Sequence, residues 1–271
     1  MLPNVLGKKI TIKDIRKLKD LPYPFTCITA YDFSSSKIIN TLDIPIILVG
    51  DSASMVMMGY DTTTSISMEE MLVFVKSVSR GSKKAHVVAD MPFMSYQSSV
   101  ELAIKNAGRF IKEGNAQSVK IEGGDYICEH VRSIVNFGIP VMGHVGLLPQ
   151  SVNQQSGYNI QGKSIKDADK ILNDALAVQD AGAFSIVLEG IPSKLAKKIT
   201  NLLYIPTIGI GAGPFCDGQI QVYHDVLGLD NTFLPKHAKK YLNLSEKIET
   251  SLNKFICEVK EKTFPSKKNF R

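Results

Sequence analysis

The sequence predicts an α/β fold, a (β/α)8 (TIM) barrel followed by a helical segment, and three observations favour it. Short runs of β-branched and apolar residues alternate along the chain with longer amphipathic stretches. The short runs are apolar at almost every position, which is typical of parallel strands covered on both faces. Polar residues stand where successive runs end. The 271 residues also suit a single barrel of about 250 residues.

Seven strand–helix units can be identified in order. The expected strands are Thr26–Tyr31, Ile44–Asp51, His86–Asp90, Ser118–Glu122, Val141–Val145, Phe184–Glu189 and Thr207–Ile210. Expected helices between them include Ser67–Ser79, Ser99–Glu113, Tyr126–Phe137, Ile165–Ala181 and Ser193–Leu203. Ser67 with Glu70, and Ser98 with Glu101, fit capping boxes at two helix starts.

An eighth strand near Thr232–Leu234 has a weak pattern, and the tail beyond Lys236 is expected to be helical. Eight such units close into a barrel. We therefore expect a single domain over residues 1–271, with the barrel at about 20–240 and the helical tail at about 241–271. A doubly wound open sheet is the structural alternative, because periodicity alone does not separate it from a barrel.

Composition and charge exclude several classes of function. The net charge is +6, but residues 1–20 carry +4, residues 21–235 carry −4 and residues 236–271 carry +6. Nucleic-acid-binding proteins more often carry a basic face on the folded body, so we expect no nucleic-acid partner. The longest apolar run, Ile44–Val49, is too short to span a membrane. With no signal-peptide pattern and no C-x-x-C cysteine spacing, a cytoplasmic globular protein is expected.

Polar residues fall at the ends of five successive expected strands. They lie in Gly50-Asp51-Ser52, Asp90-Met91-Pro92, Lys120-Ile121-Glu122-Gly123-Gly124, Gly143-His144 and Leu188-Glu189-Gly190. In a parallel barrel these strand ends point into one mouth, where active sites are built. The sequence therefore predicts a functional site at this mouth.

Three acids from adjacent strands, Asp51, Asp90 and Glu122, could converge there. A carboxylate inside a sheet end is costly unless it is paired or bound to a metal. Oxygen ligands without an accompanying cysteine suit a hard divalent ion such as Mg²⁺. Simpler roles stay open: Asp51 as a helix cap, Asp90 as a turn former, and Glu122 paired with Lys120 on the same strand face.

The other polar residues suggest contacts with a substrate. Lys120 would be a point charge for an anionic group, and Ser52 could donate to a substrate oxygen; a structural role is the alternative for each. His144 could bond the substrate or orient a loop. Glu189 stands two strands beyond the metal group, where a general base could act without binding the metal. We interpret Gly209–Gly213 as a tight turn that allows close approach of a ligand or neighbour.

Longer motifs, taken together, resemble one enzyme family. In chain order they are Phe25-x5-Tyr31-Asp32, Gly50-Asp51-Ser52, Gly59-x-Asp61-Thr62-Thr63, Ala89-Asp90-Met91-Pro92-Phe93, Val119-Lys120-Ile121-Glu122-Gly123-Gly124, Gly143-His144-Val145-Gly146-Leu147 with Pro149-Gln150, Leu188-Glu189, Gly209-Ile210-Gly211-Ala212-Gly213 and Asp217-Gly218-Gln219. From Thr11 to Tyr241 the chain resembles the ketopantoate hydroxymethyltransferases.

This resemblance implies a (β/α)8 barrel and the first committed reaction of pantothenate synthesis. A hydroxymethyl group would pass from 5,10-methylenetetrahydrofolate to 3-methyl-2-oxobutanoate, giving 2-dehydropantoate (ketopantoate) and tetrahydrofolate. The resemblance also implies Mg²⁺ held by Asp51, Asp90 and, directly or through water, Glu122. Glu189 would remove the C3 proton, giving a Mg²⁺-stabilised enolate. The residues expected at the substrate are Asp51, Ser52, Asp90, Lys120 and His144. A large homo-oligomer, a decamer, is implied as well.

Two competing functions differ in class. One is another Mg²⁺-dependent, enolate-forming carbon–carbon lyase on the same barrel. That class typically relies on a loop cysteine near the metal, and none of the four cysteines lies at a matching strand end. The other is a non-enzymatic binding or assembly protein that uses the basic chain ends. It would not explain five polar strand ends in register.

Overall fold

The protein is seen here in a computed structural model that describes residues 8–155, 157–230 and 234–270. It divides into two compact units, Met1–Gln221 and Val222–Arg271. Within the described residues, the strands lie in the first unit, and the second contains the helices α9 (Tyr223–Leu227) and α10 (Leu244–Lys260).

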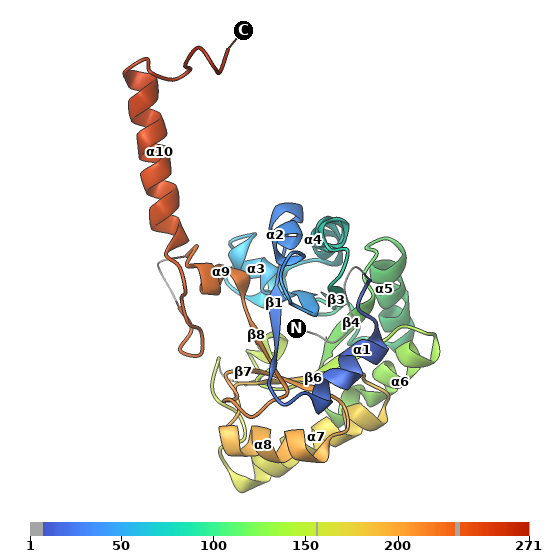
Figure 1. Ribbon diagram of the computed structural model, residues 1–271. Helices are drawn as coiled ribbons and strands as arrows, with labels where there is room; N and C mark the ends of the chain where they lie inside the picture. The colour runs from blue at the N-terminus through green and yellow to red at the C-terminus, as the bar shows by residue number, and fades with distance from the viewer. Residues whose placement is uncertain (1–7, 156, 231–233, 271) are drawn as a thin grey trace. The chain divides into compact units, whose positions relative to one another are not determined.

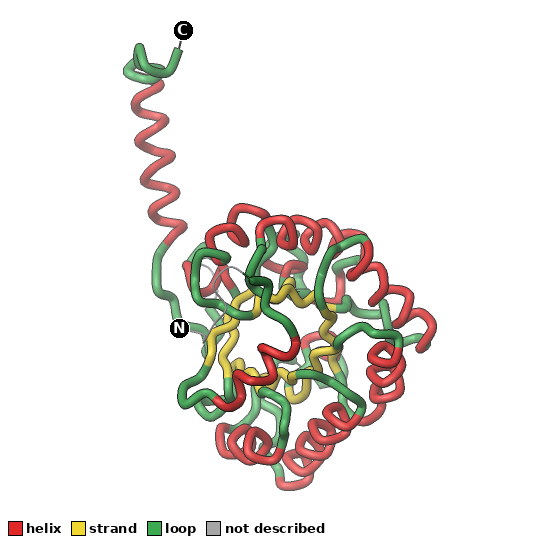
Figure 2. The backbone as a smooth tube through the Cα atoms, turned by 45° about the vertical axis from the view of Figure 1, so that its right-hand side comes forward, coloured by secondary structure: helices red, strands yellow, loops and turns green. Residues whose placement is uncertain are grey.

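Eight parallel strands close into a barrel in the first unit (Figure 2). They are β1 (Phe25–Thr29), β2 (Ile46–Val49), β3 (His86–Asp90), β4 (Ser118–Glu122), β5 (Val141–Gly146), β6 (Ser185–Glu189), β7 (Thr207–Ile210) and β8 (Gly218–Gln221). Each strand pairs with the next, and β1 pairs with β8, where Phe25 lies opposite Gly218. The closed ring confirms the predicted barrel and excludes the open sheet.

Helices surround the ring of strands (Figure 1). The helices in the described part of this unit are α1 (Ile12–Arg16), which precedes β1, and α2 (Phe33–Ile39), α3 (Ala53–Val56), α4 (Met68–Gly81), α5 (Val100–Lys112), α6 (Cys128–Asn136), α7 (Ile165–Asp180) and α8 (Ser193–Leu202), which follow strands. The short turns are η1 (Lys17–Asp20), η2 (Thr63–Ser65), η3 (Asp125–Ile127) and η4 (Pro149–Ser151). Ser67 caps α4 in the predicted capping box, because its Oγ accepts from Glu70 N and Glu70 Oε2 accepts from Ser67 N. At α5 the prediction is wrong by one residue: Ser99, not Ser98, is the cap and accepts from Leu102 N.

The first seven strands lie within two residues of their predicted limits, but the eighth does not. The barrel closes with Gly218–Gln221, so the prediction near Thr232–Leu234 is wrong; residues 232 and 233 lie outside the described part of the chain. Close packing explains why β8 lacks a strand-like sequence. A Cβ at Gly218 would lie only 2.5 Å from the Phe25 ring, so a larger residue does not fit beside β1.

The N-terminal end of the barrel is closed by apolar packing. Ile15 and Leu18, from the helical turns before β1, belong to the same buried cluster as Phe25 and Phe184. Ile10 N donates to Lys84 O, just ahead of β3, and so ties this segment to the strand starts. Apolar side chains therefore fill this end of the barrel, whereas Asp90, Glu122 and Glu189 end their strands at the opposite mouth.

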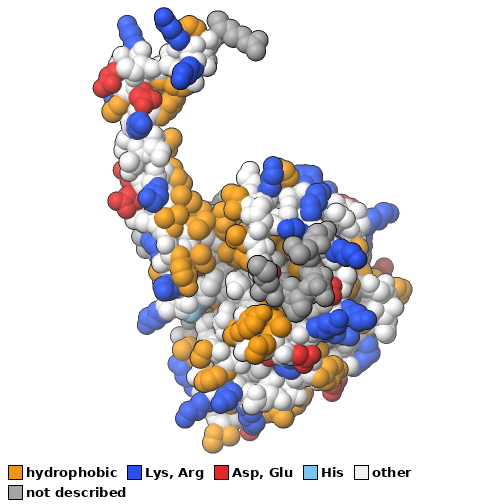
Figure 3. Space-filling model, in the orientation of Figure 1, with side chains coloured by type: hydrophobic (Ala, Val, Ile, Leu, Met, Phe, Trp, Pro, Cys, Tyr) orange, Lys and Arg blue, Asp and Glu red, His pale blue; other side chains and the backbone are white. Residues whose placement is uncertain are grey.

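The surface of the protein is expected to bind neither nucleic acid nor a membrane. Figure 3 shows Lys and Arg side chains spread over the visible face of the barrel unit, with Asp and Glu among them. None of the helices in the described ranges is both long and apolar enough to cross a bilayer. The predicted C-terminal helix is confirmed as α10, which has no buried residue and leaves Ile248, Leu252, Phe255, Ile256 and Val259 42–55% exposed.

His86, the first residue of β3, makes stability depend on pH. Its Nδ1 lies 3.2 Å from Ile10 O and its Nε2 lies 2.9 Å from Ser118 Oγ, and burial lowers the pKa of this imidazole to about 4. An unfolded histidine titrates near pH 6.5, so the unfolded chain takes up the proton first as pH falls. We therefore expect the free energy of unfolding to decrease by about 3 kcal/mol between pH 6.5 and 4 from this group alone.

The His86→Gln variant, which cannot be protonated, should lose that part of the pH dependence. Urea denaturation of both proteins at pH 7 and pH 4.5 measures it, because the carboxylates common to both titrate equally and cancel in the difference. Equal pH slopes in the two proteins would show that His86 contributes nothing.

Candidate active site

Strand register brings the predicted polar residues together at the C-terminal mouth of the barrel. In the β3–β4 pair Asp90 is opposite Lys120, and in the β4–β5 pair Glu122 is opposite His144. Glu189 ends β6 and lies opposite Gly146 of β5. The side chains that the sequence placed at one rim therefore occupy neighbouring strands, as predicted.

Asp90 and Lys120 form a buried ion pair. Lys120 Nζ lies 2.6 Å from Asp90 Oδ1, and the two residues are 3% and 1% exposed. The other oxygen, Asp90 Oδ2, accepts from Asp51 N at 3.0 Å. Burial works against the charge of Lys120, but Asp90, Glu122 and Asp51 together hold its pKa above the usual range. Asp90 is thus neither a turn former nor solvated, and Lys120 is not a surface lysine.

His144 links Glu122 to Glu189. Its Nδ1 lies 3.4 Å from Glu122 Oε1, and its Nε2 lies 3.3 Å from Glu189 Oε2. Burial and Lys120 act against protonation, but Glu122 and Glu189 outweigh them and raise the pKa of His144 to about 9. The imidazole is therefore positively charged at neutral pH, and it is held between two carboxylates.

Glu189 is the most accessible acid of this group. Its side chain is 16% exposed, whereas the Glu122 side chain is 3% exposed. Glu189 contacts His144 but belongs to a different strand from the three other acids. A carboxylate at the mouth, next to the cluster and open to an entering molecule, can accept a proton from that molecule.

Glycine makes room for the Asp51–Ser52 turn. A Cβ at Gly50 would lie 2.9 Å from Ser52 Oγ and 3.8 Å from Asp90 Oδ2. The hydroxyl of Ser52 lies 2.8 Å from Tyr31 OH, beside β1. The following helix has no side-chain cap, so the alternative that Asp51 caps it is wrong.

Gln150 and Tyr96 are site residues that the sequence did not reveal. Gln150 Nε2 donates to Asp51 Oδ2 at 3.0 Å and to Met91 O at 2.9 Å, and its backbone N donates to Glu122 Oε2 at 3.2 Å. Tyr96 OH donates to Gln150 Oε1 at 3.0 Å. Gln150 therefore orients two of the three acids. The only signal was its place in the Pro149-Gln150 motif, because a neutral amide suggests no chemistry by itself.

The carboxylates of Asp51, Asp90 and Glu122 are suitable ligands for a hard cation, although they are not arranged as a preformed metal site. Among the described residues, no three His, Cys, Asp or Glu side chains are grouped as a metal site. However, four carboxylates, those of Asp51, Asp90, Glu122 and Glu189, share two cationic side chains, Lys120 and His144. Burial, with the charges of Asp90 and Glu122, raises the pKa of Asp51 well above its usual range. The cluster thus lacks the positive charge that a divalent cation would supply.

Comparison with known proteins identifies the family. The family model described as ketopantoate hydroxymethyltransferase matches residues 9–267. The chain belongs to the ketopantoate hydroxymethyltransferase family. A 3-methyl-2-oxobutanoate hydroxymethyltransferase of Carboxydothermus hydrogenoformans is 53% identical over 261 residues, which cover 96% of this chain and 95% of the relative. The enzyme of the same name from Pelobacter propionicus is 50% identical over 264 residues, which cover 97% of this chain and 98% of the relative. The predicted enzyme class, a hydroxymethyltransferase, is therefore confirmed.

Solved structures share the barrel at low sequence identity. Phosphonopyruvate hydrolase matches with a TM-score of 0.63 and 10% identity, covering 96% of this chain and 90% of that one. A 2,3-dimethylmalate lyase, a member of the PEP mutase/isocitrate lyase superfamily, matches with a TM-score of 0.59 and 16% identity. The match covers 94% of this chain and 89% of the lyase chain. These matches support the fold, whereas the family match separates this hydroxymethyltransferase from the lyases.

Proposed function

We propose that the protein transfers a hydroxymethyl group from 5,10-methylenetetrahydrofolate to 3-methyl-2-oxobutanoate. The products are ketopantoate and tetrahydrofolate, in the first committed step of pantothenate synthesis. The observation that carries the proposal is the buried cluster of Asp51, Asp90, Lys120, Glu122 and His144 with Glu189 at its open side. Relatives at 50–53% identity bear the name of this activity.

The positive charges of the cluster suit a 2-oxoacid anion. Lys120 and His144 are the cationic side chains beside the acids, and each is held in its charged form by neighbouring carboxylates. A charge-assisted hydrogen bond from such a group to a substrate carboxylate contributes about 1.5–3 kcal/mol. Ser52 would add a hydroxyl donor to the same ligand, and Asp51 and Asp90 would meet it through the metal.

Asp51, Asp90 and, directly or through water, Glu122 would hold Mg²⁺. Carboxylate oxygens and a deficit of positive charge suit this ion. A phosphonopyruvate hydrolase of the same fold is described in complex with oxalate and Mg²⁺. When bound, the ion would act as a Lewis acid that stabilises negative charge on the keto oxygen of the substrate.

Glu189 would act as the general base. Removing a proton from C3 leaves an electron pair that is shared with the keto group as an enolate, and C3 then bonds to the one-carbon unit as the bonds of that carbon to the two folate nitrogens break. A water molecule supplies the hydroxyl group of ketopantoate, and its remaining proton and the proton taken from C3 end on the two nitrogens of tetrahydrofolate. His144, 3.3 Å from Glu189 Oε2, would orient this carboxylate toward the substrate. Glu122, on the far side of His144, would instead hold the metal, directly or through water. We also propose that the protein forms a homodecamer in the cytoplasm, and this part of the proposal is based on the family resemblance alone.

A turnover assay tests the reaction itself. We expect ketopantoate to form only when the oxoacid, 5,10-methylenetetrahydrofolate and Mg²⁺ are all present, because each supplies a different part of the chemistry. Chelation should abolish turnover, and added Mg²⁺ should restore it. Full turnover in the presence of chelator would remove the metal from the proposal, and no product from the complete mixture would overturn the reaction.

A further inference from the structure

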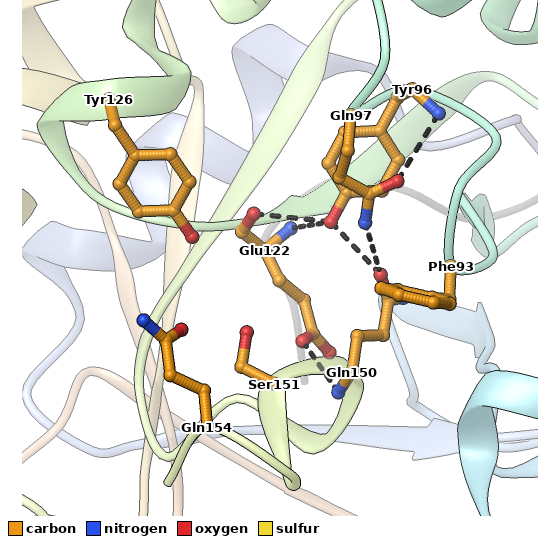
Figure 4. A pocket seen from close by; sticks show the side chains of 8 residues that line it. All are labelled: Phe93, Tyr96, Gln97, Glu122, Tyr126, Gln150, Ser151 and Gln154. Atoms are coloured by element: carbon orange, nitrogen blue, oxygen red, sulfur yellow. Dashed lines mark hydrogen bonds between the residues drawn. The ribbon is translucent and has the colours of Figure 1, made fainter.

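A cavity of about 300 Å³ lies beside the acid cluster, and the proposed reaction leaves it without a role. Its walls come from the segments that follow β3, β4 and β5. Glu122 is the member of the cluster that lines it, so the cavity opens next to the proposed reaction centre (Figure 4).

Two aromatic rings flank the cavity. Figure 4 shows Tyr126 and Phe93 on opposite sides of the opening. They are 62% and 41% exposed, so neither ring is part of the barrel core. Gly123 has φ +141°, and a Cβ there would lie 2.9 Å from Tyr126 OH, so this backbone position favours glycine and leaves room for the tyrosine. Partly exposed rings on two sides of a cavity suit a flat, unsaturated or aromatic ligand.

The polar lining offers both donors and acceptors. In the described part of the chain the side chains of Tyr126, Ser151 and Gln154 form no hydrogen bond, so two hydroxyls and one amide remain available to a ligand. Gln150, in contrast, is fully used: Tyr96 OH and Gln97 Nε2 donate to its Oε1. A ring whose edge alternates donors and acceptors, as a cyclic amide does, could pair with these groups.

The charged residues of the cavity lining indicate which of the two substrates of the proposed reaction it would bind. Glu122 is its one charged side chain, and no Lys, Arg or His belongs to the described lining. An anion such as a 2-oxoacid therefore has no cationic partner in this lining, whereas Lys120 and His144 lie in the acid cluster beside it. The cavity therefore favours a neutral ligand.

We propose that this cavity binds the pterin ring of the one-carbon donor. The reduced pterin is a neutral, fused two-ring heterocycle whose unsaturated ring is flat and carries a cyclic-amide edge, and the assignment rests on the proposed function. A volume of about 300 Å³ accepts the two rings but not the whole folate, so the rest of the donor extends to the surface past Gln154. This places the one-carbon unit on the Glu122 side of the ring.

Calorimetry with 6-methyltetrahydropterin, which lacks the folate tail, tests the site directly. We expect Tyr126→Ala to weaken binding about tenfold or more, because a stacking surface is lost. Tyr126→Phe keeps the ring and should stay within threefold of the parent chain. Phe137→Ala removes an aromatic ring that is 71% exposed and lies outside the cavity, so its affinity should not change. In turnover assays, Tyr126→Ala should raise the KM for the folate and not that for the oxoacid.

Three results would overturn the assignment. One is equal affinity of Tyr126→Ala and the parent chain for the pterin, with Phe93→Ala also unchanged. Another is an equal loss in Phe137→Ala, and the third is displacement of the pterin by 3-methyl-2-oxobutanoate. Failure of the proposed function has a different signature: the parent chain would bind the pterin in a Tyr126-dependent way and yet form no ketopantoate.

Discussion

The Glu189→Gln variant is expected to lose exchange of the C3 proton of 3-methyl-2-oxobutanoate by roughly 10² to 10⁴-fold, the usual contribution of a positioned general base. Glutamine keeps the size of the side chain and can still contact His144, whose Nε2 lies 3.3 Å from Glu189 Oε2 in the parent chain. It cannot take up the proton. Exchange in deuterated water, followed by NMR, needs no folate and so isolates this step from one-carbon transfer.

A matched substitution separates Glu189 from the acid on the other side of His144. Glu122→Gln should weaken Mg²⁺ binding together with exchange, whereas Glu189→Gln should bind both Mg²⁺ and the oxoacid as the parent chain does. If Glu189→Gln exchanges the proton at the parental rate, Glu189 is not the base. His144, which contacts both carboxylates, would then be the first candidate.

The second large effect is expected at Asp90. Asp90→Ala would leave the Lys120 ammonium buried with only a 3.5 Å contact to Glu122, a change that costs about 3–5 kcal/mol of folding stability. Asp90→Asn is the better test, because its amide oxygen can still accept a hydrogen bond from Lys120 or Asp51. With one anionic ligand lost, we expect Mg²⁺ affinity to fall by about 100-fold or more, measured by calorimetry.

Asp217→Asn is the control for Asp90→Asn. Asp217 is a largely buried carboxylate near the opposite end of the barrel, where it accepts from Lys19 Nζ and Thr207 N. Its loss should lower stability and leave Mg²⁺ affinity within twofold. Undiminished Mg²⁺ binding by Asp90→Asn would remove Asp90 from the ligands of the metal.

Seven strands could be predicted because short runs rich in β-branched and apolar residues alternate along the chain with longer amphipathic stretches. β8 could not, because Gly218, Gln219 and Gln221 have little strand propensity of their own. Its extended conformation is imposed by pairing with β1 and β7, a long-range effect. The cap of α5 was misplaced for a local reason, since Ser98 and Ser99 are adjacent and either can cap a helix.

The acids of the site could be predicted because parallel strands in register carry their ends to one mouth. The contacts between these side chains could not be predicted, because they depend on distances that the sequence does not contain. One alternative from the sequence is that Lys120 pairs with Glu122 on the same strand face, and the structure does contain this contact, at 3.5 Å, but Lys120 Nζ lies closer to Asp90, at 2.6 Å. Register between β3 and β4, which sets Asp90 opposite Lys120, decides the closer partner. Gln150 reaches the cluster from a loop whose path no local pattern encodes.

Closure of the ring by β1 and β8 has a consequence during protein synthesis. Phe25 and Gly218, which lie opposite each other, are 193 residues apart in the chain. At a ribosomal rate of about 5–20 residues per second, β1 waits about 10–40 s for this partner to be made. Throughout that time the nascent sheet has a free edge at β1, and such edges readily pair with other chains. Shielding of the growing chain by a chaperone would matter most until Gln221 has left the ribosome.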